Sequence, residues 1–422
     1  MERISPQNYG FLGILTLLNI LNFVDRTLLQ SFANFIVPDL SLTDTEYGLL
    51  VGFAFLFFYS IMGLFMGLLA DTVHRPRLIA FGVALWSLLT IASGAAKGFM
   101  SLAIPRMFIG VGESILTPTS VSLLADRIPP SRMGFAISIY YLGIPIGASL
   151  ALLVAGYLGP TLGWRKCFFI LGAVGILFAF AMLFVKETPR RGMEVSVSDE
   201  SISFLERFKL LFTTLKGSPA LIYVIIAGVI VHISLGAVSF DQLWLVQERG
   251  FERASIAKIL GWITLVGGIG GNICGGIISD LFISRFKQPR AMFLFWVGLF
   301  SAPFILAMRI ADPDSIWLPL GMFIGAFQVG CFWGPVFATV QEIAPASIRA
   351  TVVAFYILSI NLIGLGLGAT ITGISVDLLR SANYSEPYSY TLIAMNILTL
   401  SNLIFFYLAG KKKNLIRQIT ND

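Results

Sequence analysis

Long apolar runs, repeated along nearly the whole chain, constrain the fold of this protein more than any other feature. A helix needs about 20 predominantly apolar residues to cross the hydrocarbon layer of a membrane, and its backbone amides must be paired within the segment. We place twelve such runs, near residues 9–37, 47–70, 78–98, 101–126, 131–157, 165–186, 218–244, 253–279, 290–310, 316–341, 349–376 and 387–410. The sequence therefore predicts an all-α membrane protein with twelve transmembrane helices.

Charged residues are too scarce for a soluble single-core fold. Of the 422 residues, 56% are apolar and 12% are charged, whereas soluble globular domains carry about 25% charged residues. The net charge of +6 does not indicate nucleic-acid binding, because the basic residues are scattered along the predicted loops instead of forming one patch. We expect membrane lipids around this protein and no nucleic acid among its partners.

The residues that hold metals, nucleotides or acyl groups in other proteins have no suitable pattern here. The two histidines and three cysteines lack metal-ligand spacing, and no Gly-x-x-x-x-Gly-Lys-Ser/Thr sequence is present to bind ATP. No Ser, His and Asp arrangement suits acyl transfer. We therefore expect no metal, no cofactor and no enzymatic activity. The alternative, a membrane-embedded enzyme or a non-transporting receptor, would require a catalytic cluster, which the sequence does not indicate.

One long polar connection, 187–217, divides the predicted spans into two groups of six. We expect an N-terminal six-helix bundle over 1–186 and a C-terminal six-helix bundle over 218–422. Short loops carry 19 basic residues on one side of the membrane and 8 on the other, which predicts that both termini are cytoplasmic. Apolar residues recur at helical spacing within the connection and favour an amphipathic helix on the membrane surface: Ile202, Leu205, Phe208, Leu211 and Leu215.

The two halves share sequence echoes in their loops. Gly67-Leu-Leu-Ala-Asp71 closes the second span, and Gly276-Ile-Ile-Ser-Asp280 closes the eighth, 209 residues later. Two pseudo-symmetric halves with a site between them are a transporter design. We therefore favour a gating role over ordinary polar loops for the motif residues and the charges near them: Gly67, Asp71, Arg75, Asp126, Arg132, Asp280 and Arg285.

Four ionisable side chains fall inside predicted spans of the first half. Asp25 and Arg26 lie near the middle of the first span, and Arg106 and Glu113 lie on the fourth. Charges at that depth are costly unless they are paired or hydrated, so they mark a transport pathway or a structural ion pair. Arg106 and Glu113 are seven residues apart and share one helix face. A desolvated carboxyl group near an arginine is a reasonable proton carrier.

The spans of the second half hold almost no buried charge. Their candidate groups for substrate binding are His232, Gln328 and Asn361, with Trp333 and Tyr356 nearby in the sequence. A histidine can titrate near neutral pH, although a lone histidine of this kind is more often a hydrogen-bonded packing residue. An apolar, aromatic wall of this composition suits an amphipathic substrate better than a sugar.

At these residues the chain resembles the major facilitator superfamily, and more closely its Spinster branch, whose members are linked to sphingosine-1-phosphate and lysophospholipid movement. The similarity is carried by Asn22-Phe-Val-Asp25-Arg26, by Arg106 through Ser114 and by Tyr140 through Gly147. Ala125-Asp126 and Arg132 also match. Thr72 and His74 depart from the superfamily's usual loop pattern.

The resemblance implies two six-helix bundles that transport by alternating access. It also implies that Asp25 and Glu113 are the protonation pair, tuned by Arg106 and Arg26. The substrate headgroup would lie near these groups, and the candidates for binding it are Asn22, Arg26, Tyr140, Tyr141, His232, Gln328, Trp333 and Asn361. The lack of long loops fits a protein of a bacterial inner membrane. We expect a monomer, because a single twelve-helix chain needs no partner to form its cavity.

Two classes of substrate stay open. The first is an amphipathic lipid-like anion of the lysophospholipid or sphingosine-1-phosphate class, moved together with protons. The alternative is a small organic anion, such as a sugar acid, held between the guanidinium groups of Arg26 and Arg106.

Overall fold

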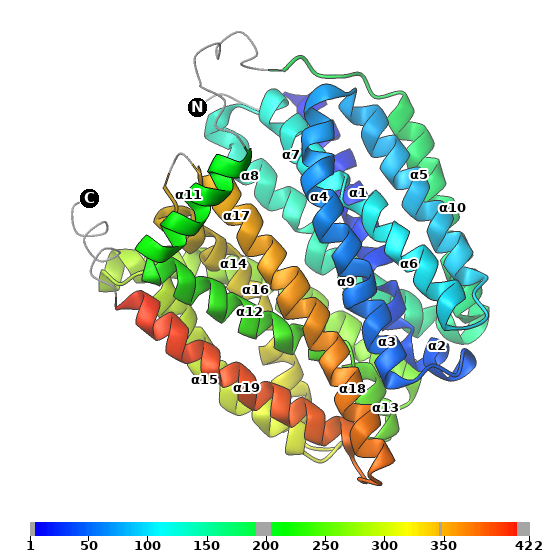
Figure 1. Ribbon diagram of the computed structural model, residues 1–422. Coiled ribbons are helices and arrows are strands. Elements are labelled where there is room, and N and C mark those ends of the chain that lie inside the picture. Colours follow the sequence, from blue (N-terminus) through cyan, green and yellow to red (C-terminus); the bar gives the residue numbers. More distant parts are fainter. Residues whose placement is uncertain (1–4, 191–203, 346–347, 412–422) are drawn as a thin grey trace. The chain divides into compact units, whose positions relative to one another are not determined.

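The computed structural model describes residues 5–190, 204–345 and 348–411, and these residues are almost entirely helical (Figure 1). Twelve of their helical spans are long and apolar enough to cross a membrane: Pro6–Ser31, Asp44–Gly67, Arg75–Gly94, Phe99–Arg127, Arg132–Tyr157, Gly159–Leu183, Pro219–Gln247, Arg253–Phe286, Arg290–Ile310, Trp317–Ile343, Thr351–Ser381 and Pro387–Gly410. The predicted fold class, an all-α protein with twelve membrane-spanning helices, is confirmed.

The chain divides into two compact units. Residues 1–197 and 252–262 form unit 1, and residues 198–251 and 263–422 form unit 2. The expected boundaries at 186 and 218 stay predictions, and part of the connection between them, 191–203, lies outside the described residues.

Unit 1 is organised around four close helix pairs. α1 packs along α9, α5 packs along both α6 and α10, and α4 packs along α6. Its helices are α1 (Pro6–Ser31), α2 (Ala33–Asp39), α3 (Asp44–Val51), α4 (Phe53–Thr72), α5 (Arg75–Gly94), α6 (Phe99–Glu113), α7 (Leu116–Arg127), α8 (Pro130–Tyr141), α9 (Gly143–Tyr157) and α10 (Gly159–Leu183).

Unit 2 has a comparable set of contacts. α12 packs against α19 and against the π-helical segment η2, and α15 packs against α16 and α19. Its helices are α11 (Phe204–Gly217), α12 (Pro219–Val238), α13 (Asp241–Gln247), α14 (Arg253–Phe286, whose first residues belong to unit 1), α15 (Arg290–Ile310), α16 (Trp317–Ile343), α17 (Arg349–Leu358), η2 (Ser359–Gly366), α18 (Leu367–Ser381) and α19 (Pro387–Gly410).

The linker helix predicted from apolar periodicity is α11. Its residue Leu211 is buried and joins the apolar core of unit 2, and Leu215 packs against the same core. Ile202 lies outside the described residues, and nothing is described of the side chains of Leu205 and Phe208.

Several spans consist of two helices in series. Phe32 separates α1 from α2, Leu142 separates α8 from α9, and Ser239-Phe240 separates α12 from α13. The break at Leu142 directly precedes Gly143 and Pro145, where proline removes one helix hydrogen bond.

Glycines bring the helices of unit 1 into close contact at the centre of the fold. A Cβ atom on Gly110 would lie 2.7 Å from the carbonyl oxygen of Phe55, and one on Gly112 would lie 3.0 Å from that of Gly82. Larger side chains at these positions would push α6 away from α4 and α5. The small residues therefore bring Glu113, the next residue on α6, close to α1, α4 and α5.

Candidate functional site

The charged residues of the first half gather in one buried cluster of unit 1. Asp25 and Arg26 come from α1, and Arg106 and Glu113 come from α6. Asp25 accepts a hydrogen bond of 2.5 Å from the hydroxyl of Thr90 on α5. Two carboxylates and two guanidinium groups balance in charge, which lowers the cost of placing them inside a membrane-spanning unit.

The ion pair in this cluster joins Arg26 to Glu113. Arg26 Nε lies 3.1 Å from Glu113 Oε2, and the side chain of Arg26 is 18% exposed whereas that of Glu113 is fully covered. The guanidinium also lies 4.2 Å from the ring centre of Tyr59 and 4.8 Å from that of Phe23. Aromatic faces attract a guanidinium at such distances. Arg26 is therefore held on several sides and is still reachable by solutes.

Arg106 is buried and contacts α1 through a different group. Its Nη2 donates a hydrogen bond of 3.2 Å to the backbone oxygen of Arg26, and its guanidinium lies 5.0 Å from the ring centre of Phe55. The shared helix face of Arg106 and Glu113 predicted their proximity, but the closest cation to Glu113 comes from α1. Within the described residues, Arg106 Nε, Glu113 Oε1 and Asn22 Nδ2 have no hydrogen-bond partner. Unfilled buried polar atoms of this kind leave sites for water or a ligand.

The two tyrosines predicted to bind substrate lie at the end of α8. Tyr140 is buried, whereas Tyr141 is 36% exposed. Their ring centres lie 5.4 Å apart. Asn19 donates a hydrogen bond of 2.8 Å to the backbone oxygen of Tyr140. This bond attaches the break between α8 and α9 to the helix that carries Asp25 and Arg26.

A histidine with one ring nitrogen free of hydrogen-bond partners within the described residues lies in the aromatic core of unit 2. His232 is buried, its Nδ1 lies 2.7 Å from the backbone oxygen of Gly228, and its ring packs 5.2 Å from that of Trp333. Because a carbonyl oxygen only accepts, Nδ1 carries the proton and Nε2 is left as an acceptor. Neither His232 Nε2 nor the hydroxyl of Tyr356 has a partner within the described residues.

The remaining candidates of unit 2 are partly buried. Asn361 belongs to the π-helical segment η2, a rare geometry that is frequent at functional sites. Gln328 lies on α16, and its amide nitrogen approaches Gly298 of α15. The structure thus brings His232 and Trp333 together and places Gln328 against a neighbouring helix.

Among the gating candidates, Arg75 is the most enclosed. It is 1% exposed and begins α5. Its guanidinium lies 2.5 Å from Asp126 and 3.0 Å from Glu187, and it donates to Ser122 and to the backbone oxygen of Thr188. These contacts join the starts and ends of three spans: α5, α7 and α10.

Glu187 is held in its charged form by this contact. Partial burial would raise the pKa of Glu187, but hydrogen bonds from the backbone of Thr188, from the backbone of Arg75 and from the Arg75 side chain outweigh it and lower the pKa. His74 caps the start of α5 and lies 3.8 Å from the same carboxylate.

Unit 2 contains a matching contact at the start of α15. Arg290 forms an ion pair of 2.5 Å with Asp280 and another ion pair with Glu342. Arg75 and Arg290 both begin a helix and both pair with a carboxylate near the end of the next span. Arg285, the other basic gating candidate of this unit, is exposed. Gly67 has open space around its Cα, Arg132 is partly buried, and the side chain of Asp71 lies outside the described part.

The expectation that the second half holds almost no buried charge is wrong. Arg309 is 1% exposed and forms an ion pair with Asp241. Arg309 lies at the end of an apolar run in the sequence. A basic residue at such a position cannot be distinguished from an ordinary loop charge by sequence alone.

Comparison with known proteins settles the family. Residues 15–369 match the family model described as Major Facilitator Superfamily. The chain belongs to the major facilitator superfamily. This superfamily consists of transporters, so the chain is an integral membrane protein with a transport function.

Relatives of this major facilitator protein include an efflux pump, a hexuronate transporter and a spinster homologue. It is 27% identical to an MFS-type efflux pump of Mycolicibacterium smegmatis, with 97% of this chain and 95% of the pump covered. It is 26% identical to the hexuronate transporter of Bacillus subtilis over 86% of both chains. It is also 26% identical to protein spinster homolog 1 of Xenopus tropicalis, with 83% of this chain and 69% of the relative covered.

A solved structure supports the placement within the superfamily. The crystal structure of a bacterial homologue of the human lysosomal transporter Spinster, inward-facing and unoccupied, has a TM-score of 0.84, 26% identity and 98% coverage of both chains. The predicted resemblance to the Spinster branch is confirmed. The protein is a major facilitator transporter of Spinster type.

Proposed function

We propose that this transporter couples an anionic substrate to protons by alternating access, and that the charge cluster of α1, α5 and α6 is the coupling site. The observation that supports this proposal is the Arg26–Glu113 ion pair. Its carboxylate is fully covered, whereas its guanidinium is partly exposed. An anion can therefore reach the cation of this pair more readily than a proton reaches the carboxylate.

The coupling follows from the counter-charge of Glu113. A covered carboxylate stays charged only when a cation faces it, because desolvation favours the protonated form. An anion that binds the Arg26 guanidinium weakens this counter-charge and so favours protonation of Glu113. By linkage, protonation of Glu113 strengthens anion binding by the same factor. One proton and one anion then move together.

Asp25 and Arg106 support this exchange from the same helices. Asp25 is held by the hydroxyl of Thr90, and Arg106 is held by the backbone of α1. Their opposite charges keep the cluster balanced while Arg26 changes partners. Asp25 is the second carboxylate that a proton could occupy, as the Spinster resemblance implies.

We propose an amphipathic lipid-like anion, of the lysophospholipid or sphingosine-1-phosphate class, as the substrate. Arg26 would bind its phosphate, and the aromatic side chains around Arg26 would contact its apolar part. A relative of Arabidopsis thaliana that is named a probable sphingolipid transporter, spinster homolog 2, supports this class. A sugar acid is the second candidate, and the hexuronate transporter of Bacillus subtilis supports it.

Transport by purified protein in liposomes tests the coupling. Uptake of radiolabelled lysophosphatidylglycerol and of D-glucuronate is measured with and without an imposed pH gradient. We expect the gradient to accelerate uptake of one of them in the wild type, and Glu113→Gln or Asp25→Asn to abolish the acceleration. Asp314→Asn, which neutralises an exposed loop carboxylate, is the matched control. Gradient-driven uptake that is unchanged in both cluster variants would refute the proposal.

Thermal unfolding in detergent separates the two substrate classes. A ligand that binds the folded protein raises the unfolding temperature, and the stabilisation grows with the logarithm of ligand concentration over Kd. Stabilisation by lysophosphatidylglycerol or sphingosine-1-phosphate, lost in Arg26→Ala, supports the lipid-like anion. Stabilisation by D-glucuronate alone supports the sugar acid.

A further inference from the structure

A buried arginine in unit 2 stands apart from the proposed coupling site. Arg309 lies on the last turn of α15, and its Nη1 lies 2.8 Å from Asp241 Oδ1. Its Nε donates a hydrogen bond of 2.9 Å to Asn396 on α19, and its guanidinium lies 4.7 Å from the ring centre of Trp244 on α13. The side chain therefore joins α13, α15 and α19.

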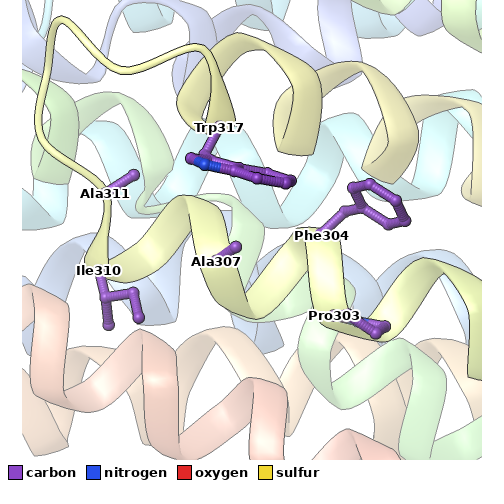
Figure 2. A pocket seen from close by; sticks show the side chains of 6 residues that line it. All are labelled: Pro303, Phe304, Ala307, Ile310, Ala311 and Trp317. Atoms are coloured by element: carbon purple, nitrogen blue, oxygen red, sulfur yellow. The ribbon is translucent and has the colours of Figure 1, made fainter.

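Arg309 turns inward from a helix end that is otherwise apolar. Three residues on another face of the same turns, Pro303, Ala307 and Ile310, line a hollow that Phe304 and Trp317 complete (Figure 2). A charge on that face would meet lipid. By pointing toward α13 and α19 instead, the Arg309 side chain keeps Asp241 as its counter-charge.

The carboxylate that meets Arg309 is placed by a helix break. α12 ends at Val238 and α13 begins at Asp241, with Ser239-Phe240 between them. In unit 1, α1 ends at Ser31, Phe32 alone interrupts the helix, and α2 begins at Ala33. The two Ser-Phe pairs are 208 residues apart (239 − 31), close to the 209 residues between the repeated loop motifs.

The break itself does not require a charge. The position of unit 1 that corresponds to Asp241 is Ala33, at the same 208-residue offset. Ala33 is fully buried, and the first span still breaks there. Asp241 is therefore an addition to the repeated architecture, and its cost in a membrane-spanning segment calls for a function.

The two partners differ in access to solvent. The Asp241 side chain is 16% exposed, whereas that of Arg309 is 1% exposed. A proton can reach the carboxylate, but the guanidinium stays enclosed. Protonation of Asp241 would leave a buried cation without its counter-charge, which costs more than breaking a surface pair. The pair therefore responds to a proton by a change in packing.

Other charged groups attach the far end of α13. Arg249 pairs with Glu386 at 3.2 Å and donates to the backbone oxygen of Arg309 at 2.9 Å. Glu248 accepts hydrogen bonds from the backbone of Tyr388 and Ser389 at the start of α19. The charged and titratable groups facing this region are thus Arg309 from α15, Glu248 and Arg249 after α13, and Glu386 and Tyr388 at the start of α19.

We propose that Asp241 is a protonation site of the transport cycle outside the cluster of α1, α5 and α6, with Arg309 as the fixed charge that converts its protonation into movement of α13. A proton from water adds to one carboxylate oxygen of Asp241, the ion pair becomes a contact between a neutral carboxyl group and the Arg309 cation, and no other bond changes. Trp244 and Glu248 still attach α13 to the start of α19, and α13 turns about the break at Ser239-Phe240. This inference rests on the proposed proton-coupled transport.

Infrared difference spectroscopy tests the site without a substrate. The protein in liposomes is compared between acidic and neutral pH, and protonated carboxyl groups give a resolved C=O stretching band. We expect Asp241→Asn to remove one component of this band and Glu113→Gln to remove another. Asp39→Asn, which neutralises an exposed carboxylate paired with Arg165 in unit 1, is the matched control. An unchanged band in Asp241→Asn would overturn the inference.

Transport assays separate this inference from the proposed function. Asp241→Asn is expected to keep exchange of labelled for unlabelled lysophosphatidylglycerol, or D-glucuronate if that is the transported probe, and to lose accumulation driven by a pH gradient. Wild-type accumulation in Asp241→Asn, together with lost accumulation in Glu113→Gln, would refute the role of Asp241 alone. Wild-type accumulation in both variants would refute the proposed function itself.

A conservative variant covers the case in which Asp241→Asn fails to fold. Asp241→Glu keeps the charge and moves it by one methylene, and thermal unfolding checks that the variant is folded. We expect it to keep accumulation but to shift the pH midpoint of exchange, because the carboxylate no longer faces Arg309 at the same distance. An unchanged midpoint would count against a protonation role.

Discussion

Replacement of Arg75 by alanine is the sharpest test of how the ends of unit 1 are held together. The guanidinium is almost fully enclosed and contacts two carboxylates, Asp126 and Glu187, as well as Ser122 and the backbone oxygen of Thr188. Arg75→Ala removes every one of these contacts at once. It removes the Arg75 cation from both Asp126 and Glu187.

The magnitude follows from the exposure of the partners. Breaking a buried ion pair by removing one partner costs about 3–5 kcal/mol. The side chains of Asp126 and Glu187 are 11% and 30% exposed, so water can reach both once the arginine is gone. We therefore expect the lower end of this range, about 3 kcal/mol of the free energy of unfolding.

Thermal unfolding of the purified protein in detergent measures this loss. For a unit of this size, 1 kcal/mol corresponds to about 2–4 °C, so Arg75→Ala should unfold roughly 6–12 °C below the wild type. Arg77→Ala is the matched control, because Arg77 lies on the same helix turn and is exposed. Surface changes of this kind stay within about 0.5 kcal/mol. Equal unfolding temperatures for the two variants would refute the role of the Arg75 contacts.

The pH dependence of the same measurement has a defined sign. The folded state lowers the pKa of Glu187, so the stabilisation is fully present above the ordinary glutamate pKa of about 4.3 and is lost as the pH falls through the lowered value. The difference between the wild type and Arg75→Ala should be largest near neutral pH. The difference should narrow as the pH falls below the ordinary glutamate pKa. A difference that grows in acid would contradict the role of Glu187 as the titrating group.

Three further substitutions test the packing of unit 1. Gly147→Val should abolish the monodisperse peak in size-exclusion chromatography, because a Cβ there would lie 2.6 Å from atoms of α1, whereas Gly134→Val, with nothing within 4 Å, should not. Asp39→Asn should cost only about 0–1 kcal/mol in thermal unfolding, since the pair with Arg165 is well exposed. Gly163→Ala should cost about 1 kcal/mol in the same assay, because Gly163 has a φ of 73° that alanine adopts with strain.

The number of spans and the charges inside them could be predicted because both are local properties of the sequence. Hydropathy over about 20 residues identifies a span without knowledge of its neighbours. A charge such as Asp25 or Glu113 stands out because its surroundings in the sequence are apolar. The repeated Gly-x-x-x-Asp motifs, Gly67–Asp71 and Gly276–Asp280, are also local in sequence, and their separation of 209 residues predicted a duplicated architecture.

The partners of these charges could not be predicted, because they come from other helices. The helical period placed Arg106 and Glu113 on one face, but the cation closest to Glu113 is Arg26 of α1. Arg309 appeared as a charge at the end of a span, and its burial depends on Trp244 and Asn396, which lie 65 and 87 residues away in sequence (309 − 244 and 396 − 309). Only tertiary packing decides which helix covers a span end.

The two proposed protonation sites differ in which partner solvent reaches, and this difference gives them different parts in one cycle. In the Arg26–Glu113 pair the cation is accessible and the carboxylate is covered, so the event that opens the pair is the arrival of an anion. In the Asp241–Arg309 pair the carboxylate is accessible and the cation is covered, so the event that opens it is the arrival of a proton. A transporter with both pairs would respond to the anion through one unit and to pH through the other. Strict coupling then requires that neither anion binding nor protonation alone completes the conformational change. Anion binding alone leaves the Asp241–Arg309 pair intact, and protonation of Asp241 alone leaves the Arg26–Glu113 pair intact.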